Sequence, residues 1–184
     1  KNPVIFVEHR LLYETTAPVP EEPYTVDFGK ARLARPGKDI TIVGISNMFM
    51  ECMRASEILS EEGIEAEVID PISLVPLDMQ TILKSANKTR RLLVVDNAWT
   101  NCGASAEIIA QTAEMSKGQV AKLKRLGYAP TTCPTSPALE QVFYPNPGTI
   151  AQTAYQMVKD ENSEWKPHSE RAKLTYQSQF RGPF

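Results

Sequence analysis

The sequence has few of the residues that mark several common protein classes. It contains only three cysteines, Cys52, Cys102 and Cys133, at wide spacing. An odd, scattered set forms neither a disulfide framework nor a metal-ligand pattern, so we expect a reducing, cytoplasmic compartment. No apolar run approaches the roughly 20 residues that a membrane-spanning helix needs. We therefore expect no membrane partner.

Excess charge and the common ligand-binding motifs are also missing. The net charge of -2 gives no electrostatic reason to expect nucleic acid. The patterns GxGxxG, GxxxxGK[ST] and GxSxG do not occur, which argues against a dinucleotide site, a P-loop and a nucleophile elbow. The start, Lys1-Asn2-Pro3, leads directly into a β-prone run, so no signal peptide is expected.

The segment from Ile64 to Asp96 organises the rest of the chain. A β-prone run over 66–69 ends at Asp70-Pro71, because proline cannot continue an interior strand. An extended crossover over 72–76 follows, and Asp78 stands where the N-cap of a helix belongs. The unbroken apolar run over 92–95 is typical of a strand covered on both faces. Together these parts predict a βαβ unit in a parallel sheet.

The remaining elements fit the same architecture. Alternation over 30–35 predicts an edge strand, and 40–45 predicts a buried strand. The turn at 36–39 implies that these two strands run antiparallel or lie on different sides of the sheet. Ser46 or Asn47 is the expected cap of a helix ending at Gly63. A loop over 97–103, a helix over 104–115, an exposed strand over 120–126, a proline-rich loop and a helix from Asn146-Pro147 to about 159 complete the domain.

The two ends of the chain read differently from its middle. The run over 4–7 is β-prone, but 14–28 is acidic, rich in proline and without a usable period, as in a linker. We therefore expect the chain to come from a longer protein, with residues 1–13 ending a preceding domain and 14–28 linking it to a domain over 29–159. Residues 160–184 form a polar tail. Its only side chains expected to dock on the domain are Trp165, Tyr176, Phe180 and Phe184.

No complete catalytic set is visible. Cys102 at a helix start has no neighbouring histidine in the sequence, since His9 and His168 fall in the extensions, and it reads more simply as a small helix-start residue. Asp70 and Asp78 are explained as a strand end and a helix cap. Trp99 in a polar loop indicates a contact surface, with a ring folded over the sheet edge as an equal alternative.

Several motifs in order resemble the C-terminal domain of the transketolase superfamily, with the β subunit of the E1 component of 2-oxo acid dehydrogenases as the best match. The motifs are FVEHRLLY, GKARLARPG, LVPLD with KTRRLLVVD, GASAEIIA, and CPTSPALEQVFYPNPGTI. They cover about residues 3–159. The tail lies outside the resemblance, and WTNCG has fewer glycines than the family form.

The resemblance implies an α/β fold: a three-layer αβα sandwich around a five-stranded, mostly parallel sheet with one antiparallel edge strand. It implies an enzyme that uses thiamine diphosphate with Mg²⁺, decarboxylates a 2-oxo acid and passes the acyl group to a lipoyl carrier. In this family the cofactor lies between two other domains, so the resemblance implies no catalytic, cofactor-binding or metal-binding residue here, and no catalysis by this fragment alone.

The family's C-terminal domain holds subunits together, which implies a dimer, an E1 α-type subunit and an acyltransferase core as partners. We expect an apolar patch over 97–112 to be buried on association, with Trp99, Asn101, Cys102 and Ile108 as candidate interface residues. Two alternatives stay open: a stand-alone Rossmann- or flavodoxin-like module for a small ligand, and a transketolase-like enzyme acting on sugar phosphates.

Overall fold

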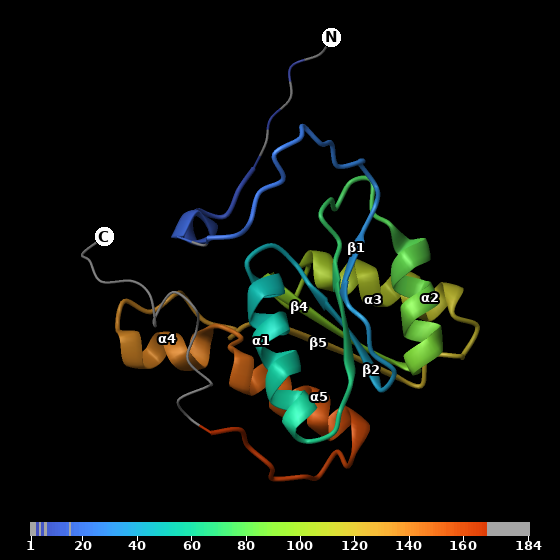
Figure 1. Cartoon of the computed structure of the whole chain (residues 1–184). Helices are drawn as coiled ribbons and strands as arrows, with labels where there is room; N and C mark the ends of the chain where they lie inside the picture. The colour runs from blue at the N-terminus through green and yellow to red at the C-terminus, as the bar shows by residue number, and fades with distance from the viewer. Residues whose placement is uncertain (1–2, 4, 6, 15, 169–184) are drawn as a thin grey trace.

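The architecture is a single five-stranded sheet between two layers of helices, as expected (Figure 1). The computed structural model describes residues 3, 5, 7–14 and 16–168. In chain order the elements are η1 (Arg10–Glu14), β1 (Arg32–Arg35), β2 (Ile40–Gly44), α1 (Met48–Glu61), β3 (Ala66–Asp70), α2 (Met79–Thr89), β4 (Arg91–Trp99), α3 (Ala104–Met115), β5 (Lys122–Tyr128), α4 (Pro137–Phe143) and α5 (Pro147–Val158).

The strand order is β1-β3-β2-β4-β5. β1 pairs antiparallel with β3, and the other neighbouring strands are parallel. β1 and β2 therefore run in opposite directions, as the turn between them predicted, with β3 inserted between them. The predicted antiparallel edge strand is confirmed.

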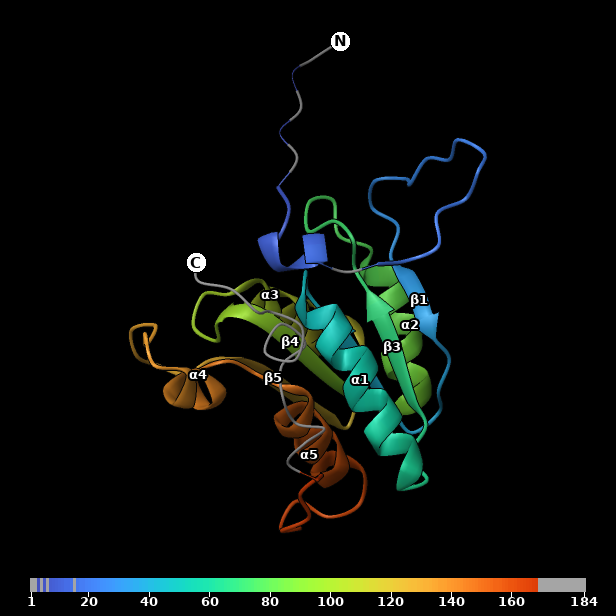
Figure 2. The same cartoon turned by 60° about the vertical axis from the view of Figure 1, so that its left-hand side comes forward.

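The core lies on both faces of the sheet. Leu93 and Val95 of β4 pack in the cluster under α1 and α5, whereas Leu92 and Val94 pack in the cluster under α2 and α3. Figure 2 shows α1 and α5 on one side of the sheet and α2 and α3 on the other. All four side chains are fully buried, each stabilising the fold by about 1.5–3 kcal/mol. The unbroken apolar run of β4 is thus explained by helices on both sides.

Several predicted helix ends are confirmed by their hydrogen bonds. Asp78 caps α2 by accepting from the Thr81 N–H at 3.1 Å. Asn146 forms a capping box with Thr149 at the start of α5. Gly63 follows α1 with φ 71°, and its N–H donates to the Ser60 carbonyl.

Some local expectations were wrong. β4 continues to Trp99, which pairs with Tyr128, so residues 97–99 are strand rather than loop. The crossover is not uniformly extended, because Ile72 adopts φ 59°. Asn47 stands at the N-cap of α1, but its side chain makes no capping hydrogen bond.

The proline-rich stretch also contains α4, which was not predicted. Ser136 stands at the N-cap of this helix, and its carbonyl accepts from the N–H groups of Leu139 and Glu140 at 3.0 Å. Pro137 at the first helical position favours this start, because its fixed φ suits a helix and its missing N–H would have no partner there.

The ends of the chain differ in how they contact the domain. Ile5 and Val7 are exposed and belong to no strand, while Val4 and Phe6 lie outside the described residues. A strand over 4–7 needs a neighbouring strand, and none pairs with Ile5 or Val7 within the described chain. Trp165 does dock, stacking on Tyr155 with ring centroids 4.4 Å apart. Tyr176, Phe180 and Phe184 fall outside the described residues.

No helix within residues 3–168, apart from the undescribed positions 4, 6 and 15, is both long and apolar enough to cross a membrane.

Candidate association surface

The parallel strands place their following loops at one edge of the sheet, here called the carboxyl edge. The strand order reverses between β2 and β4, where the Ile45 N–H donates to the Val95 carbonyl at 2.9 Å. In open α/β sheets this edge carries most binding surfaces. The loops after β2, β3 and β4 and the segment leading to α4 all start there.

Trp99 lies at this edge with 51% of its surface exposed. Its indole N–H donates to the Thr131 carbonyl at 3.3 Å, and its ring meets Tyr128 edge-on at 6.0 Å. The ring therefore folds over the end of β5, which was one of the two interpretations of the sequence. Half of its surface still faces solvent, as the other interpretation, a contact surface, requires. Both interpretations describe part of the arrangement.

Trp99 extends an aromatic cluster that was not predicted from the sequence. Tyr128 stacks on Phe143 at 5.0 Å, and both rings meet Tyr144 edge-on at 5.1 and 4.8 Å. Aromatic pairs of this geometry contribute about 0.5–1.5 kcal/mol each beyond their burial. The cluster attaches α4 to the sheet. The signal was present as the tyrosines and phenylalanine flanking the proline-rich stretch, but only the unpredicted α4 brings them together.

Asn101 and Cys102 are exposed in the loop that leads to α3. Cys102 has φ 60° and makes no hydrogen bond or ion pair with any residue in the described part of the chain. The next residue is Gly103, and only glycine fits there, because a Cβ would lie 2.4 Å from the Trp99 carbonyl oxygen. The geometry thus provides Cys102 with no general base, and the loop is suited to contact rather than to thiol chemistry.

Ile108 does not belong to this surface, which corrects its assignment as an interface residue. Its side chain is fully buried in the cluster between α3 and the sheet. Helical spacing puts Ile108 on the same face as Ser105 and Thr112, which are also buried. That face packs against this domain's own sheet, so it is not available to a partner.

The two acids of the crossover have structural roles, as interpreted from the sequence. Asp70 pairs with Arg32 at 3.0 Å and accepts from the Ile72 N–H at 3.0 Å. Asp78 accepts from the N–H groups of Ala31 and Thr81. Burial alone would raise the pKa of Asp78, but these hydrogen bonds outweigh it and hold the pKa below its ordinary value. An ionised cap at a helix start is not a proton donor.

The larger feature of this edge is its exposed apolar surface. After β3 the crossover exposes Val75 (91%), Ile72 and Leu74. The segment that leads into β1, residues 27–31, is here called the entrance segment, and it exposes Phe28 (76%). A Cβ added at Gly29 would lie 3.0 Å from the ring of Pro76, so the entrance segment and the crossover are in contact. Leu139 and Val142 of α4 are also exposed. The exposure of these residues could not be predicted from the sequence, because apolar residues in loops lack the periodicity that marks core positions.

The described residues provide no ligand set for the Mg²⁺ that the resemblance implies for the whole enzyme. Within them, no three His, Cys, Asp or Glu side chains gather as a metal site would require.

The comparisons with known proteins agree with this fold. The family described as "Transketolase, C-terminal domain" matches residues 29–150. The chain is 40% identical to the β subunit of acetoin:2,6-dichlorophenolindophenol oxidoreductase from Cupriavidus necator over 159 residues, covering 86% of this chain and 47% of the relative. It is 36% identical to the β subunit of the pyruvate dehydrogenase E1 component from Staphylococcus aureus over 160 residues, covering 86% of this chain and 49% of the relative.

A solved structure shares the fold. It is described as a split-gene transketolase in an inactive β4 tetramer, with a TM-score of 0.66 and 22% identity over 73% of this chain and 44% of the other. The chain spans about half the length of the curated relatives it matches. It belongs to the transketolase C-terminal domain family, and its sequence is similar to the β subunits of pyruvate dehydrogenase and acetoin oxidoreductase.

Proposed function

We propose that this chain supplies the subunit-association domain of a thiamine diphosphate-dependent, E1β-type enzyme of the cytoplasm. The whole enzyme oxidises a 2-oxo acid or acetoin and passes the acyl group to a lipoyl carrier. Its catalytic centre, with thiamine diphosphate and Mg²⁺, lies in domains other than residues 29–159. The partners are a second β-type subunit, an α-type subunit and an acyltransferase core.

The observation that carries this proposal is the apolar carboxyl edge. Val75 at 91% exposure and Phe28 at 76% lie in two segments that touch at Gly29 and Pro76, and exposed apolar side chains gathered in this way are typical of a surface that a partner covers. Trp99 adds the kind of half-buried aromatic side chain that dominates binding energy in protein interfaces. We include Asn101 and Cys102 as flanking contacts, since both are exposed in the same loop.

The choice of reaction rests on the relatives. Identities of 36–40% to subunits named for pyruvate and acetoin support this substrate class over sugar phosphates. A stand-alone ligand-binding module is disfavoured, because the family match covers residues 29–150 and the relatives are about twice as long. The free state of all three cysteines suits a reducing cytoplasm.

An activity assay tests the division of labour. The 184-residue chain alone, given thiamine diphosphate, Mg²⁺, and pyruvate or acetoin, should not reduce 2,6-dichlorophenolindophenol. The full-length β-type protein assembled with an α-type subunit should reduce the dye with one of the two substrates. Turnover by the chain alone would overturn the assignment of the catalytic centre. An assembled enzyme that acts only on a ketose phosphate would overturn the substrate class.

A further inference from the structure

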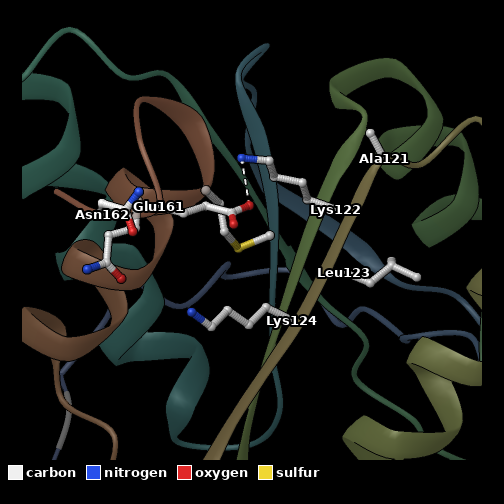
Figure 3. A pocket seen from close by; sticks show the side chains of 8 residues that line it. Ala121, Lys122, Leu123, Lys124, Glu161 and Asn162 are labelled. Atoms are coloured by element: carbon white, nitrogen blue, oxygen red, sulfur yellow. Dashed lines mark ion pairs between the residues drawn. The ribbon is translucent and has the colours of Figure 1, made fainter.

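A second candidate site lies at the opposite, amino end of β5. A hollow of about 600 Å³ opens between the start of β5, the end of α5 and the segment after it (Figure 3). This volume is within the range of small-molecule sites. The side chains that matter are Lys122 and Lys124 of β5, Gln156 and Met157 of α5, and Glu161 and Asn162 beyond it.

The two lysines enter the hollow because of strand geometry. Lys122 and Lys124 are two residues apart and therefore point to the same face of β5. Leu123 between them packs with the core cluster under α2 and α3, on the other face. Figure 3 shows both lysine side chains extending toward α5 and Leu123 extending away from it. Two ammonium groups are thus directed at one cavity.

Only one of these ammonium groups is neutralised. Lys122 pairs with Glu161 at 3.0 Å, whereas Lys124 has no counter-ion among the described residues. Gln156 is held in place because its amide N–H donates to the Ser163 carbonyl at 3.0 Å. The Met157 side chain is 4% exposed and forms an apolar floor. The hollow therefore offers one free positive charge, amide groups and an apolar surface.

We propose that this hollow binds a small organic anion, with its carboxylate or phosphate group at Lys124 and its apolar part against Met157. Lysine recognises either group as a point charge, so the shared chemistry is one anionic head on a compact apolar body. Asn162 lines the opening from the other side.

The site is separate from the association surface. Trp99 and Tyr128 mark the carboxyl end of β5, and Lys122 and Lys124 lie at its amino end. The walls formed by residues 156–162 follow the part of the chain that the family matches, residues 29–150. The proposed ligand therefore does not depend on the proposed function.

Thermal unfolding of the 184-residue chain tests the site, with benzoate and phenyl phosphate as probes and phenol as the neutral control. A ligand that binds only the folded state raises the Tm in a saturable way. We expect both anions, or one of them, to do so, and phenol not to. The response to each anion separately shows whether the site takes carboxylates, phosphates or both.

The matched variants are Lys124→Gln and Lys84→Gln, each removing one exposed lysine charge. Lys124→Gln should weaken the binding of the effective anion about tenfold or more, because a charge-assisted contact is lost. Lys84→Gln, on α2 across the sheet, should bind like the unsubstituted chain. The proposal is overturned if neither anion shifts the Tm, if phenol shifts it equally, or if both variants respond alike.

Discussion

Among single residues, Glu67 shows how a charge is accommodated inside this domain. Its carboxylate is 2% exposed on β3 and accepts from Ser85, Lys88 and the Gly37 N–H. Ser85 also hydrogen-bonds Thr41 at 2.7 Å. Burial alone would raise the pKa of Glu67, but these donors outweigh it and hold the pKa below its ordinary value of 4.5. The carboxylate thus links α2 to β2 and β3.

The depressed pKa fixes the sign of a pH effect. Glu67 contributes stability that is fully present above pH 4.5 and is lost as the pH falls through its lower, folded-state pKa. Glu67→Gln should therefore lower the free energy of unfolding by about 1–3 kcal/mol at pH 7, where charged hydrogen bonds are lost. The difference should shrink as the pH falls below 4.5. Urea unfolding of both proteins at pH 7 and at a pH below 4.5 measures this difference in the free energy of unfolding.

Glu65→Gln is the matched control, since Glu65 is an exposed partner of Lys38 just before β3. An exposed pair of this kind is screened by water and adds little to stability, so Glu65→Gln should be nearly neutral. If Glu67→Gln were no more destabilising than Glu65→Gln at pH 7, the carboxylate network would not be a stabilising part of the fold.

At the scale of elements, α2 connects the entrance segment to the sheet. The cap Asp78 accepts from Thr81 within the helix and from the Ala31 N–H, just before β1, at 3.0 Å. In the same region the Gly29 N–H donates to Ser73 of the crossover at 3.0 Å. One carboxylate therefore begins the helix and holds the edge strand against it.

Asp78→Ala should lower the free energy of unfolding by about 1–2 kcal/mol, the usual cost of removing an N-cap. Hydrogen exchange should also quicken at Thr81 and at Ala31, because both N–H groups lose their acceptor. Asp27→Ala, an exposed acid in the entrance segment, should change stability by less than about 0.5 kcal/mol. Unaltered exchange at Ala31 would contradict the link between β1 and α2.

At the scale of the whole molecule, the sheet has two different ends. The carboxyl edge exposes the crossover, Phe28 and Trp99, whereas the amino end of β5 carries the basic hollow. Partner association and binding of a small anion would then use opposite ends of one rigid sheet. Neither needs the other's residues, so each can be tested by itself.

Trp99→Ala should weaken self-association of the chain by about 30-fold or more, as truncation of an interface hot spot does. Sedimentation velocity over a concentration series measures the change. Met115→Ala is the matched control, because Met115 is exposed to a similar extent, 45% against 51%, at the far end of α3. A sedimentation profile that Trp99→Ala leaves unaltered would exclude this edge as the association surface.

Local sequence was sufficient for most elements. Asp78, Gly63 and Asn146 act through hydrogen bonds to residues a few positions away, so their roles could be predicted from spacing. The motifs of the resemblance led to the strand arrangement and the family, both of which were confirmed. The surface was predicted less well. Trp99 was correctly placed outside the core, whereas Ile108 was expected on the buried face of its helix and also assigned to the interface, and it is fully buried.

What the sequence by itself determined is therefore the fold class, the family, and most of the strands and helices with several of their ends, because periodicity, capping and motifs are properties of short stretches. Only the tertiary structure decided which faces stay open to solvent. Tyr128 holds α4 in place, and Lys124 faces a hollow because α5 and the segment after it return beside β5. Each depends on contacts between residues distant in the chain, which no local pattern encodes.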